Sequence, residues 1–279
     1  MNKQRSSFLK SLIYIVSRFV LRKKFMVGFS RKFNLKMKFK TQDGGGREIF
    51  KRSTYEDENS TFLTNNLQLN AGDIVLDIGA NIGWYSILLD KNFPNIKVYS
   101  FEPDPVNIEC FQHNIKLNNS KNIELVEKAV SDKNGRQKMY VYKNSNKGRN
   151  SLLPINNYGT LEIEVLKLDD FIQQKNLKQV RFVKIDIEGY EYFALQGAKI
   201  MLEEVELLMM EFAPGYMKKG NVNPKDVLAL LQQFRFHPHV LDSQQLNPVS
   251  YEQLLQHENN IDLYLLKENQ QILLYNLIQ

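Results

Sequence analysis

The sequence is poor in cysteine: Cys110 is the only one in 279 residues. A single cysteine cannot form an intramolecular disulfide or supply a cysteine metal cluster. Cys110 falls in a predicted helix over 104–117, where a free cysteine usually acts as a small buried apolar residue. The four histidines fall outside every motif: His113, His237, His239 and His257. These scarcities exclude a disulfide scaffold and favour a reducing compartment, so we expect a cytoplasmic protein.

Long uncharged apolar runs are also missing. The most apolar early stretch, residues 8–24, contains Arg18, whereas a bilayer-spanning helix needs ~20 mostly apolar residues. That arginine, and the lack of an A-x-A-like site after it, also argue against a secretory signal. At helical spacing the apolar residues fall on one side, opposite the basic residues and serines: they are Leu9, Leu12, Ile13, Val16, Phe19 and Val20.

This basic amphipathic helix has two interpretations. It either caps the catalytic domain with its apolar side, which we favour, or lies on an anionic membrane or a partner surface. The second alternative would give peripheral membrane contact through residues 1–30. The sequence carries no indication of an oligomeric state.

Positive charge is scarce outside the N-terminal segment. Residues 1–52 carry 15 Lys and Arg against two acids, a net of +13, and the remainder carries 22 against 29, a net of −7. Binding to the phosphates of a nucleic acid needs basic residues at the binding face. An acidic body therefore disfavours nucleic acid and favours a small-molecule or glycan partner.

The chain is organised around the stretch DIVLDIGANIGWYS, residues 73–86. A short β-branched run over 74–78 predicts a buried strand, and apolar residues from Trp84 onward predict a helix. The small residues between them form a turn whose backbone N–H groups a ligand can approach closely. The order is strand, glycine turn, helix.

The spacing in this turn distinguishes subclasses of nucleotide-binding sheet. The pattern is Asp77-x-Gly79-x-x-x-Gly83, without the G-x-G-x-x-G of a pyrophosphate site. An acid before the turn would repel pyrophosphate but suits the ammonium of an amino-acid-like cofactor. About 20 residues beyond the glycines, a second predicted strand ends at Glu102, where a carboxylate can accept ribose hydroxyls.

Three motifs in order resemble S-adenosylmethionine-dependent methyltransferases of the FkbM type: VLDIGANIGWYS, then SFEPD at 100–104, then VKIDIEGYE at 183–191. The likeness spans residues 35–266 and extends to the pair Tyr55-Glu56. It implies an α/β, Rossmann-like class I fold, with a mainly parallel seven-stranded sheet covered by helices on both faces. Residues 1–52 are expected as a helical and β extension, and residues 53–279 as the methyltransferase domain.

The patterns also predict the order of the elements. Strands are expected over 35–39, 47–51, 74–78, 97–101, 123–130, 137–142, 161–168, 180–185, 205–210, 238–241 and 261–266. Helices are expected over 56–67, 84–91, 104–117, 169–174, 190–202 and 224–234. Residues 143–158 are expected as a mobile loop near the ligand, and 271–277 as a final apolar segment of undetermined type.

The ligand of such a sheet binds beyond the carboxyl ends of its strands. By resemblance, Asp77 and the backbone of 79–83 hold the methionine part of S-adenosyl-L-methionine, Glu102 the ribose, and Ala129 borders the adenine. The expected cofactor-binding residues are Glu56, Asp77, Gly79, Ala80, Asn81, Gly83, Ser86, Glu102, Pro103, Ala129 and Asp186.

The catalytic candidates follow the strand over 180–185. Asp186 is the candidate base or acceptor anchor, with Glu188 beside it and Lys184 on the same side of the strand. Asp186, Glu188 and Glu211 could instead hold a divalent cation through oxygen ligands. The sequence leaves these two alternatives open.

Three functional classes remain. The resemblance favours an O-methyltransferase acting on a hydroxyl of a sugar, glycan or secondary metabolite. An RNA ribose 2′-O-methyltransferase would need a basic cleft, which the acidic body lacks. A binding module without turnover would not need Asp186 and Glu188.

Overall fold

The computed structural model describes residues 2–142, 150–154 and 159–267, with side chains from residue 9 onward. Its centre is an eight-stranded sheet in the order β12-β11-β13-β10-β9-β3-β4-β5. The strands are β3 (Ile74–Ile78), β4 (Lys97–Phe101), β5 (Ile123–Val126), β9 (Val180–Ile185), β10 (Leu207–Phe212), β11 (Phe236–Asp242), β12 (Gln245–Pro248) and β13 (Ile261–Lys267). The predicted α/β class is therefore confirmed, with eight strands in place of seven.

The sheet is parallel on one side and antiparallel on the other. Strands β5, β4, β3, β9 and β10 run parallel. Strand β13 pairs antiparallel with β10, and β11 and β12 continue in alternating directions. The chain leaves β3 toward β4 and β5 and later returns on the other side as β9. The junction of β3 and β9 is thus the switch point where such sheets bind ligands.

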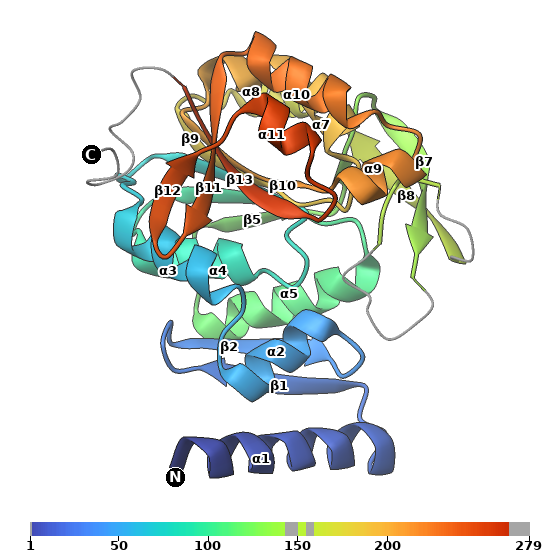
Figure 1. Ribbon diagram of the computed structural model, residues 1–279. Helices are drawn as coiled ribbons and strands as arrows, with labels where there is room; N and C mark the ends of the chain where they lie inside the picture. Colours follow the sequence, from blue (N-terminus) through green and yellow to red (C-terminus); the bar gives the residue numbers. More distant parts are fainter. Residues whose placement is uncertain (1, 143–149, 155–158, 268–279) are drawn as a thin grey trace.

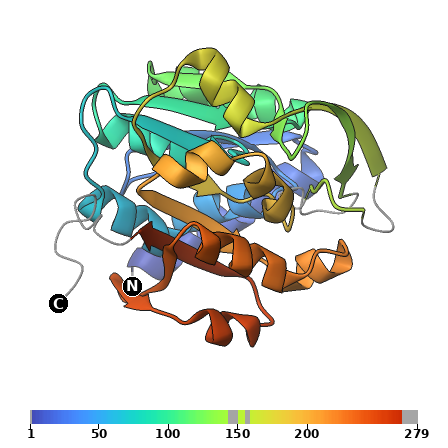
Figure 2. The same ribbon diagram turned by 90° about the horizontal axis from the view of Figure 1, so that it is seen from above.

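Both faces of the sheet are buried, as the apolar strand sequences require. One core contains Leu76 and Ile78 under helices α6 (Leu168–Lys175), α7 (Glu191–Gln196), α8 (Lys199–Glu204), α9 (Pro214–Lys219), α10 (Pro224–Gln233) and α11 (Tyr251–Leu255). The other contains Val75 under helices α3 (Asp57–Asn66), α4 (Trp84–Asn92) and α5 (Pro105–Asn118). Figure 1 shows these two layers above and below the strands, and Figure 2 the upper layer in front.

The N-terminal elements lie below the second layer (Figure 1). They are α1 (Asn2–Ile15), a π-helical turn η1 (Val16–Val20), the hairpin of β1 (Phe25–Ser30) and β2 (Leu35–Lys40), and α2 (Gly44–Arg52). On α5, the Asn114 side chain accepts the N–H of Lys38 in β2 and donates to its carbonyl. The Asn118 side chain makes the same pair of hydrogen bonds with Lys36. These bonds satisfy an edge that would otherwise expose backbone groups.

Four sequence expectations are corrected by the structure. Residues 47–51 are helical in α2 because Asp43 caps it by accepting the Gly46 N–H at 2.6 Å. The strand expected over 123–130 is divided, since Ala129–Val130 forms β6 in a separate three-stranded sheet with β7 (Gly135–Val141) and β8 (Gly159–Leu166). The helix expected over 190–202 is divided into α7 and α8, because Gly197 lies against the Ser131 carbonyl, 2.0 Å from where a Cβ would be.

The fourth correction concerns the N-terminal helix. Its apolar side does not cap the domain: Leu12, Phe19 and Val20 are exposed, and Tyr14 and Ser17 are buried instead. None of the described helices is both long and apolar enough to cross a membrane. The expected loop over 143–158 lies partly, and the segment over 271–277 wholly, outside the described residues.

Candidate functional site

The glycine turn after β3 makes a close backbone contact with the end of β9. Gly79 has φ +82°, and a Cβ there would lie 1.9 Å from the carbonyl oxygen of Asp186. The Asp186 N–H donates to the Ile78 carbonyl at 3.0 Å. Only glycine fits this position, because both the conformation and the space exclude a side chain. The first and third sequence motifs are thereby joined at one point.

Gly83 is required for a contact between two helices, whereas Gly79 is required for a contact between two strands. Its φ is +86°, and a Cβ would lie 2.1 Å from the ring of Phe111 on α5. It begins α4 as the residue before Trp84. Gly83 therefore allows α4 to pack against α5, and it does not line the cavity described next.

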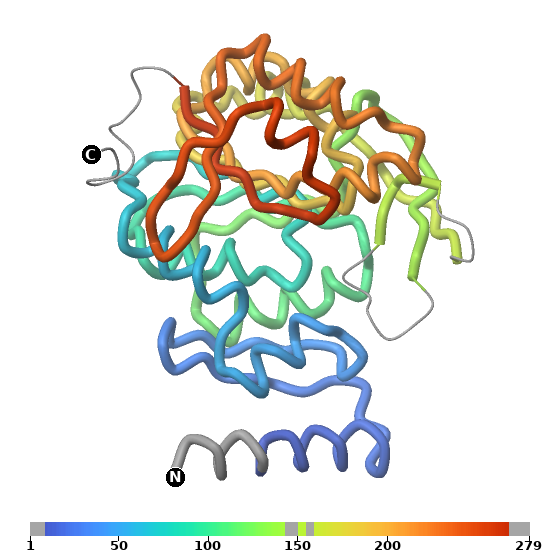
Figure 3. Tube along the Cα trace, viewed as in Figure 1, coloured from blue at the N-terminus to red at the C-terminus, as the bar shows by residue number. Residues whose placement is uncertain are grey.

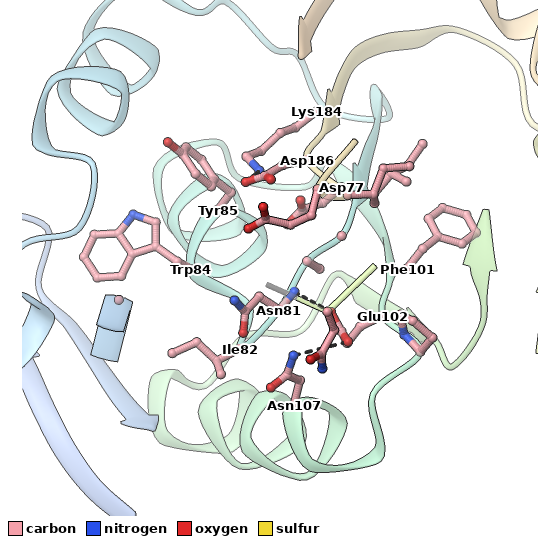
Figure 4. A pocket seen from close by; sticks show the side chains of 18 of the residues that line it. Asp77, Asn81, Ile82, Trp84, Tyr85, Phe101, Glu102, Asn107, Lys184 and Asp186 are labelled. Atoms are coloured by element: carbon pink, nitrogen blue, oxygen red, sulfur yellow. Dashed lines mark hydrogen bonds and ion pairs between the residues drawn. The ribbon is translucent and has the colours of Figure 1, made fainter. Parts of the chain in front are cut away.

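A cavity of about 280 Å³ opens at the switch point (Figure 4). Most of the predicted site residues line it: Asp77, Gly79, Ala80, Asn81, Glu102, Pro103, Ala129, Lys184, Asp186 and Glu188. Glu56, Gly83, Ser86 and Glu211 do not. The structure thus brings the ends of β3, β4 and β9 together around one space.

Asp77 is almost fully buried at the cavity wall, with 1% of its surface exposed. Its Oδ2 accepts hydrogen bonds from the N–H (3.1 Å) and the hydroxyl (2.5 Å) of Ser86, and that hydroxyl contacts Ser100 Oγ at 2.8 Å. Its Oδ1 is buried with no hydrogen-bond partner. Ser86 therefore orients Asp77 from behind and leaves one carboxylate oxygen unused.

Glu102 is held at the opposite end of the turn. Its Oε2 accepts the Asn81 N–H at 2.9 Å, and its Oε1 accepts the Asp104 N–H at 2.8 Å and the Asn107 amide at 3.3 Å. Burial raises the pKa of Glu102 to about 7, although these hydrogen bonds oppose the shift. The side chain is fixed by three donors before any ligand arrives.

Lys184 and Asp186 form a pair on β9, and Asp77 is the register partner of Lys184 on β3. Lys184 Nζ donates to Asp186 Oδ2 at 3.1 Å, and it lies 4.8 Å from the centre of the Tyr85 ring. Burial disfavours the ammonium, but the carboxylates of Asp186 and Asp77 outweigh it and raise the pKa of Lys184. Figure 4 shows Lys184, Asp186 and Asp77 grouped on one side of the cavity.

The loop after Asp186 is held by a buried acid, Glu191, which was not among the predicted site residues. Glu191 Oε1 accepts the N–H groups of Ile187 and Gly189 at 3.1 and 3.2 Å. Between them Glu188 adopts a left-handed backbone, φ +55°, and its carbonyl accepts the Ser151 hydroxyl at 2.9 Å. The spacing E-G-Y-E in the third motif could have indicated this role. It places Glu191 just after the loop, where its carboxylate can accept hydrogen bonds from the loop's N–H groups.

Two predicted site residues with buried carboxyl groups, Glu56 and Glu211, do not line the cavity. Glu56 accepts a hydrogen bond from the Tyr85 hydroxyl, and burial raises its pKa. Glu211 accepts from Asn260 at 3.0 Å and has a buried Oε2 without a partner. Among the described residues, no group of three His, Cys, Asp or Glu side chains is arranged to hold a metal ion, so the grouping of Asp186, Glu188 and Glu211 considered above is not found there.

Glu211 gives a pH-dependent stability that can be measured. Burial, with the charges of Asp186 and Glu188, raises its pKa to about 9. A raised carboxyl pKa means that the native state favours the protonated form, so stability is full below about pH 4.5 and is lost as pH rises toward 9. Glu211→Gln should melt at least several degrees above wild type at pH 8, since one pKa unit is worth ~1.4 kcal/mol.

At pH 5 this advantage of Glu211→Gln should disappear. Glu204→Gln is the matched control, because Glu204 is exposed. A constant difference in melting temperature from pH 5 to pH 8 would show that Glu211 is not a destabilising buried charge.

One wall of the cavity comes from the N-terminal segment and is not predicted by the sequence patterns. It consists of Asp43 before α2, Gly44 and Glu48 in α2, and Tyr55 after it. No sequence signal marks these residues, because a run of three glycines such as the one that begins α2 is typical of a turn. The segment expected to be an extension is thus part of the site.

Comparison with known proteins shows the family to which the chain is similar. The protein family described as "Methyltransferase FkbM domain" matches residues 77–238 of the chain. The 2-O-methyltransferase NoeI of Sinorhizobium fredii is 24% identical, covering 58% of this chain and 72% of NoeI. The hexuronic acid methyltransferase AglP of Haloferax volcanii is 25% identical, covering 58% and 62%. The 31-O-demethyl-FK506 methyltransferase FkbM of Streptomyces tacrolimicus is 26% identical, covering 55% and 67%.

Across the matching curated proteins, these three included, the chain covers between 57% and 72% of the relative's own length. The matched domain extends from Asp77 on β3 to Pro238 on β11 and includes the cavity residues that follow β3, β4 and β9, but not the wall from the N-terminal segment. It spans more than half of the chain. The protein therefore belongs to the family of FkbM methyltransferase domains.

Proposed function

We propose that this protein is an S-adenosyl-L-methionine-dependent O-methyltransferase whose acceptor is a hydroxyl of a sugar, glycan or secondary metabolite. The observation that carries the proposal is the shared cavity. The cavity has the glycine turn with Glu102 at one end, and Asp77 with the Lys184–Asp186 pair at the other. Groups suited to binding the cofactor and a group suited to binding the acceptor hydroxyl therefore lie around the same cavity.

The residues present fit this cofactor. The unused Oδ1 of Asp77 suits a cationic group such as an amino-acid ammonium. Gly79, Ala80 and Asn81 line the cavity, so a ligand there lies against the turn that follows β3. Glu102 presents a carboxylate, the acceptor that ribose hydroxyls need. When bound, S-adenosyl-L-methionine supplies a methyl group already activated on a sulfonium.

The chain's own residues have two tasks in this reaction. Asp186, with 30% of its side chain exposed beside Lys184 at 6%, faces the cavity as the group that can hold an acceptor hydroxyl and take its proton. Lys184 fixes the carboxylate through the 3.1 Å bond. Such alignment of reacting groups can supply several kcal/mol of the barrier, ~7–11 in the best cases.

The acceptor class is supported by the relatives and by the cavity wall. The printed names of the three relatives include a 2-O-methyltransferase, a hexuronic acid methyltransferase and an O-demethyl-FK506 methyltransferase. Asp43, Glu48 and Asn150 line the cavity and offer hydrogen-bond groups for hydroxyls.

An RNA ribose acceptor is disfavoured by the same wall. Asp43, Glu48, Asp186 and Glu188 line the cavity, and Lys184 is the only Lys, Arg or His in its described lining. Phosphate binding needs positive charge at this place. A binding module without turnover is disfavoured because the Asp186 carboxylate, fixed by Lys184 and partly exposed to the cavity, is suited to holding an acceptor hydroxyl.

The acceptor can be identified directly. The full-length protein is incubated with isotopically labelled cofactor and a panel of glycans, sugars and hydroxylated metabolites, and products are identified by mass spectrometry. We expect a labelled methyl group on a hydroxyl oxygen. Labelling of RNA alone would replace the proposal with the ribose alternative, and cofactor binding without any labelled product would favour the binding module.

Replacing Glu102 should weaken cofactor binding. Losing a hydrogen bond to a charged group costs ~1.5–3 kcal/mol, so Glu102→Ala should bind S-adenosyl-L-methionine about tenfold or more weakly by calorimetry. With the pKa of Glu102 at about 7, wild-type affinity should also rise from pH 6 to pH 8 as the carboxyl ionises. Exposed Glu127 provides the control variant Glu127→Ala. Equal affinity in both variants would remove Glu102 from the binding site.

A further inference from the structure

The N-terminal helix turns its polar side toward the protein. Tyr14, only 3% exposed, donates its hydroxyl to the Thr41 carbonyl at 2.5 Å. The Lys10 ammonium donates to Ser53 Oγ at 2.5 Å, and Arg18 reaches the Tyr14 hydroxyl at 3.4 Å. Polar contacts of this kind hold α1 against α2.

The apolar side of the same helix faces away from the protein. Its side chains are exposed to 37–70%, highest for Phe19 and Val20: Leu9, Leu12, Ile13, Ile15, Val16, Phe19, Val20 and Leu21. They make up eight of the thirteen exposed large hydrophobic residues in the described chain. Figure 3 shows the helix at the edge of the molecule, beyond β1, β2 and α2.

This orientation is the reverse of an ordinary surface helix, which buries its apolar stripe and exposes its charges. Contiguous apolar patches of this kind mark contact with another protein or a membrane. The patch, residues 9–21, is followed at once by the exposed Arg22, Lys23 and Lys24. An apolar face bordered by basic residues is typical of helices that lie in a membrane interface.

A basic hollow lies on the polar side of the same helix, where it faces the protein. It has a volume of about 480 Å³ between α1 and α2, and its cationic lining residues are Arg18, Arg47, Lys51 and Arg52, beside the acids Asp43 and Glu48. With residues 1–52 at a net +13, a second copy of this chain would bring like charge to the patch. An anionic lipid surface is complementary to both the apolar face and the charge.

We propose that this face docks on an anionic membrane surface. The apolar side chains over 9–21 enter the boundary between headgroups and acyl chains, and the neighbouring arginines and lysines meet lipid phosphates. The proposal does not depend on the methyltransferase reaction, because it concerns a face formed by α1 and η1 outside the catalytic cavity.

The test uses full-length protein and vesicle sedimentation. Vesicles of phosphatidylcholine are compared with vesicles of equal parts phosphatidylcholine and phosphatidylglycerol, at low salt and at about 1 M salt, where the Debye length is ~3 Å. We expect binding to the anionic vesicles that is weakened by salt. The variant Leu12→Ser/Phe19→Ser/Val20→Ser should bind them about a hundredfold more weakly at an unchanged melting temperature, because these side chains are already exposed.

The matched control is Ile200→Ser/Leu255→Ser, which removes exposed apolar side chains from other helices and should bind like wild type. Equal vesicle binding by the triple variant would overturn the proposal, and so would the absence of binding to anionic vesicles. If sedimentation velocity instead shows a dimer that the triple variant loses, with no vesicle binding, the occupant is a second copy and the proposal is wrong.

Discussion

Replacing Asp186 by asparagine is expected to slow methyl transfer at least about a hundredfold, in keeping with general-base contributions of ~10²–10⁴. Asparagine keeps the size of the side chain but cannot take a proton from a hydroxyl. It also loses the charged bond to Lys184 at 3.1 Å. Initial rates with the acceptor found by mass spectrometry measure the effect, and calorimetry should show cofactor affinity within a few-fold of wild type.

Asp170→Asn is a suitable control for this experiment, because Asp170 is an exposed carboxylate on α6 and lies outside the cavity. It should retain the wild-type rate. A fully active Asp186→Asn enzyme would remove Asp186 both as a base and as an acceptor anchor. A variant that loses cofactor binding and activity together would instead place Asp186 on the cofactor side of the cavity.

The second large effect is expected for Gly79→Ala. The new methyl carbon would lie 1.9 Å from the Asp186 carbonyl oxygen, and that oxygen belongs to the backbone and cannot rotate away. The strands β3 and β9 must then separate at the switch point, which should abolish measurable cofactor binding. Thermal unfolding should shift down by roughly 10 °C or more, since each kcal/mol corresponds to ~2–4 °C in a protein of this size.

Gly72→Ala separates this clash from backbone strain alone. Gly72 has a similar φ of +92°, and a Cβ there meets nothing within 4 Å. Its cost should be limited to the ~1–2 kcal/mol of a left-handed conformation, with cofactor binding retained. If the two variants melted at the same temperature and bound cofactor equally, the close contact between Gly79 and Asp186 would have no energetic importance.

The cavity was predictable from sequence where chemistry and periodicity coincide. A buried strand, a glycine turn and a helix can be identified from residues 74–89, because each depends on local residue types. In a parallel sheet the strand ends meet at one edge, so Asp77, Glu102 and Asp186 were expected together, and the structure brings them together.

Other features depend on contacts between distant segments. The division of the helix expected over 190–202 comes from Gly197 meeting the Ser131 carbonyl, which no local pattern reveals. The orientation of α1 has a similar cause: its sequence specifies two sides, but contacts with distant residues, such as Tyr14 with Thr41 and Lys10 with Ser53, accompany the side that faces the protein. Propensity and periodicity cannot choose between such tertiary alternatives.

The contact between Gly79 and Asp186 also bears on how acceptor preference can diverge. Main-chain atoms set the spacing between Asp77 and Asp186, through Gly79 and the 3.0 Å bond from the Asp186 N–H to Ile78. Other cavity residues, such as Glu48 and Asn150, come from α2 and from the segment after β7. Under the proposed function, we expect substitutions at these positions to change acceptor preference while the backbone junction keeps the spacing of Asp77 and Asp186.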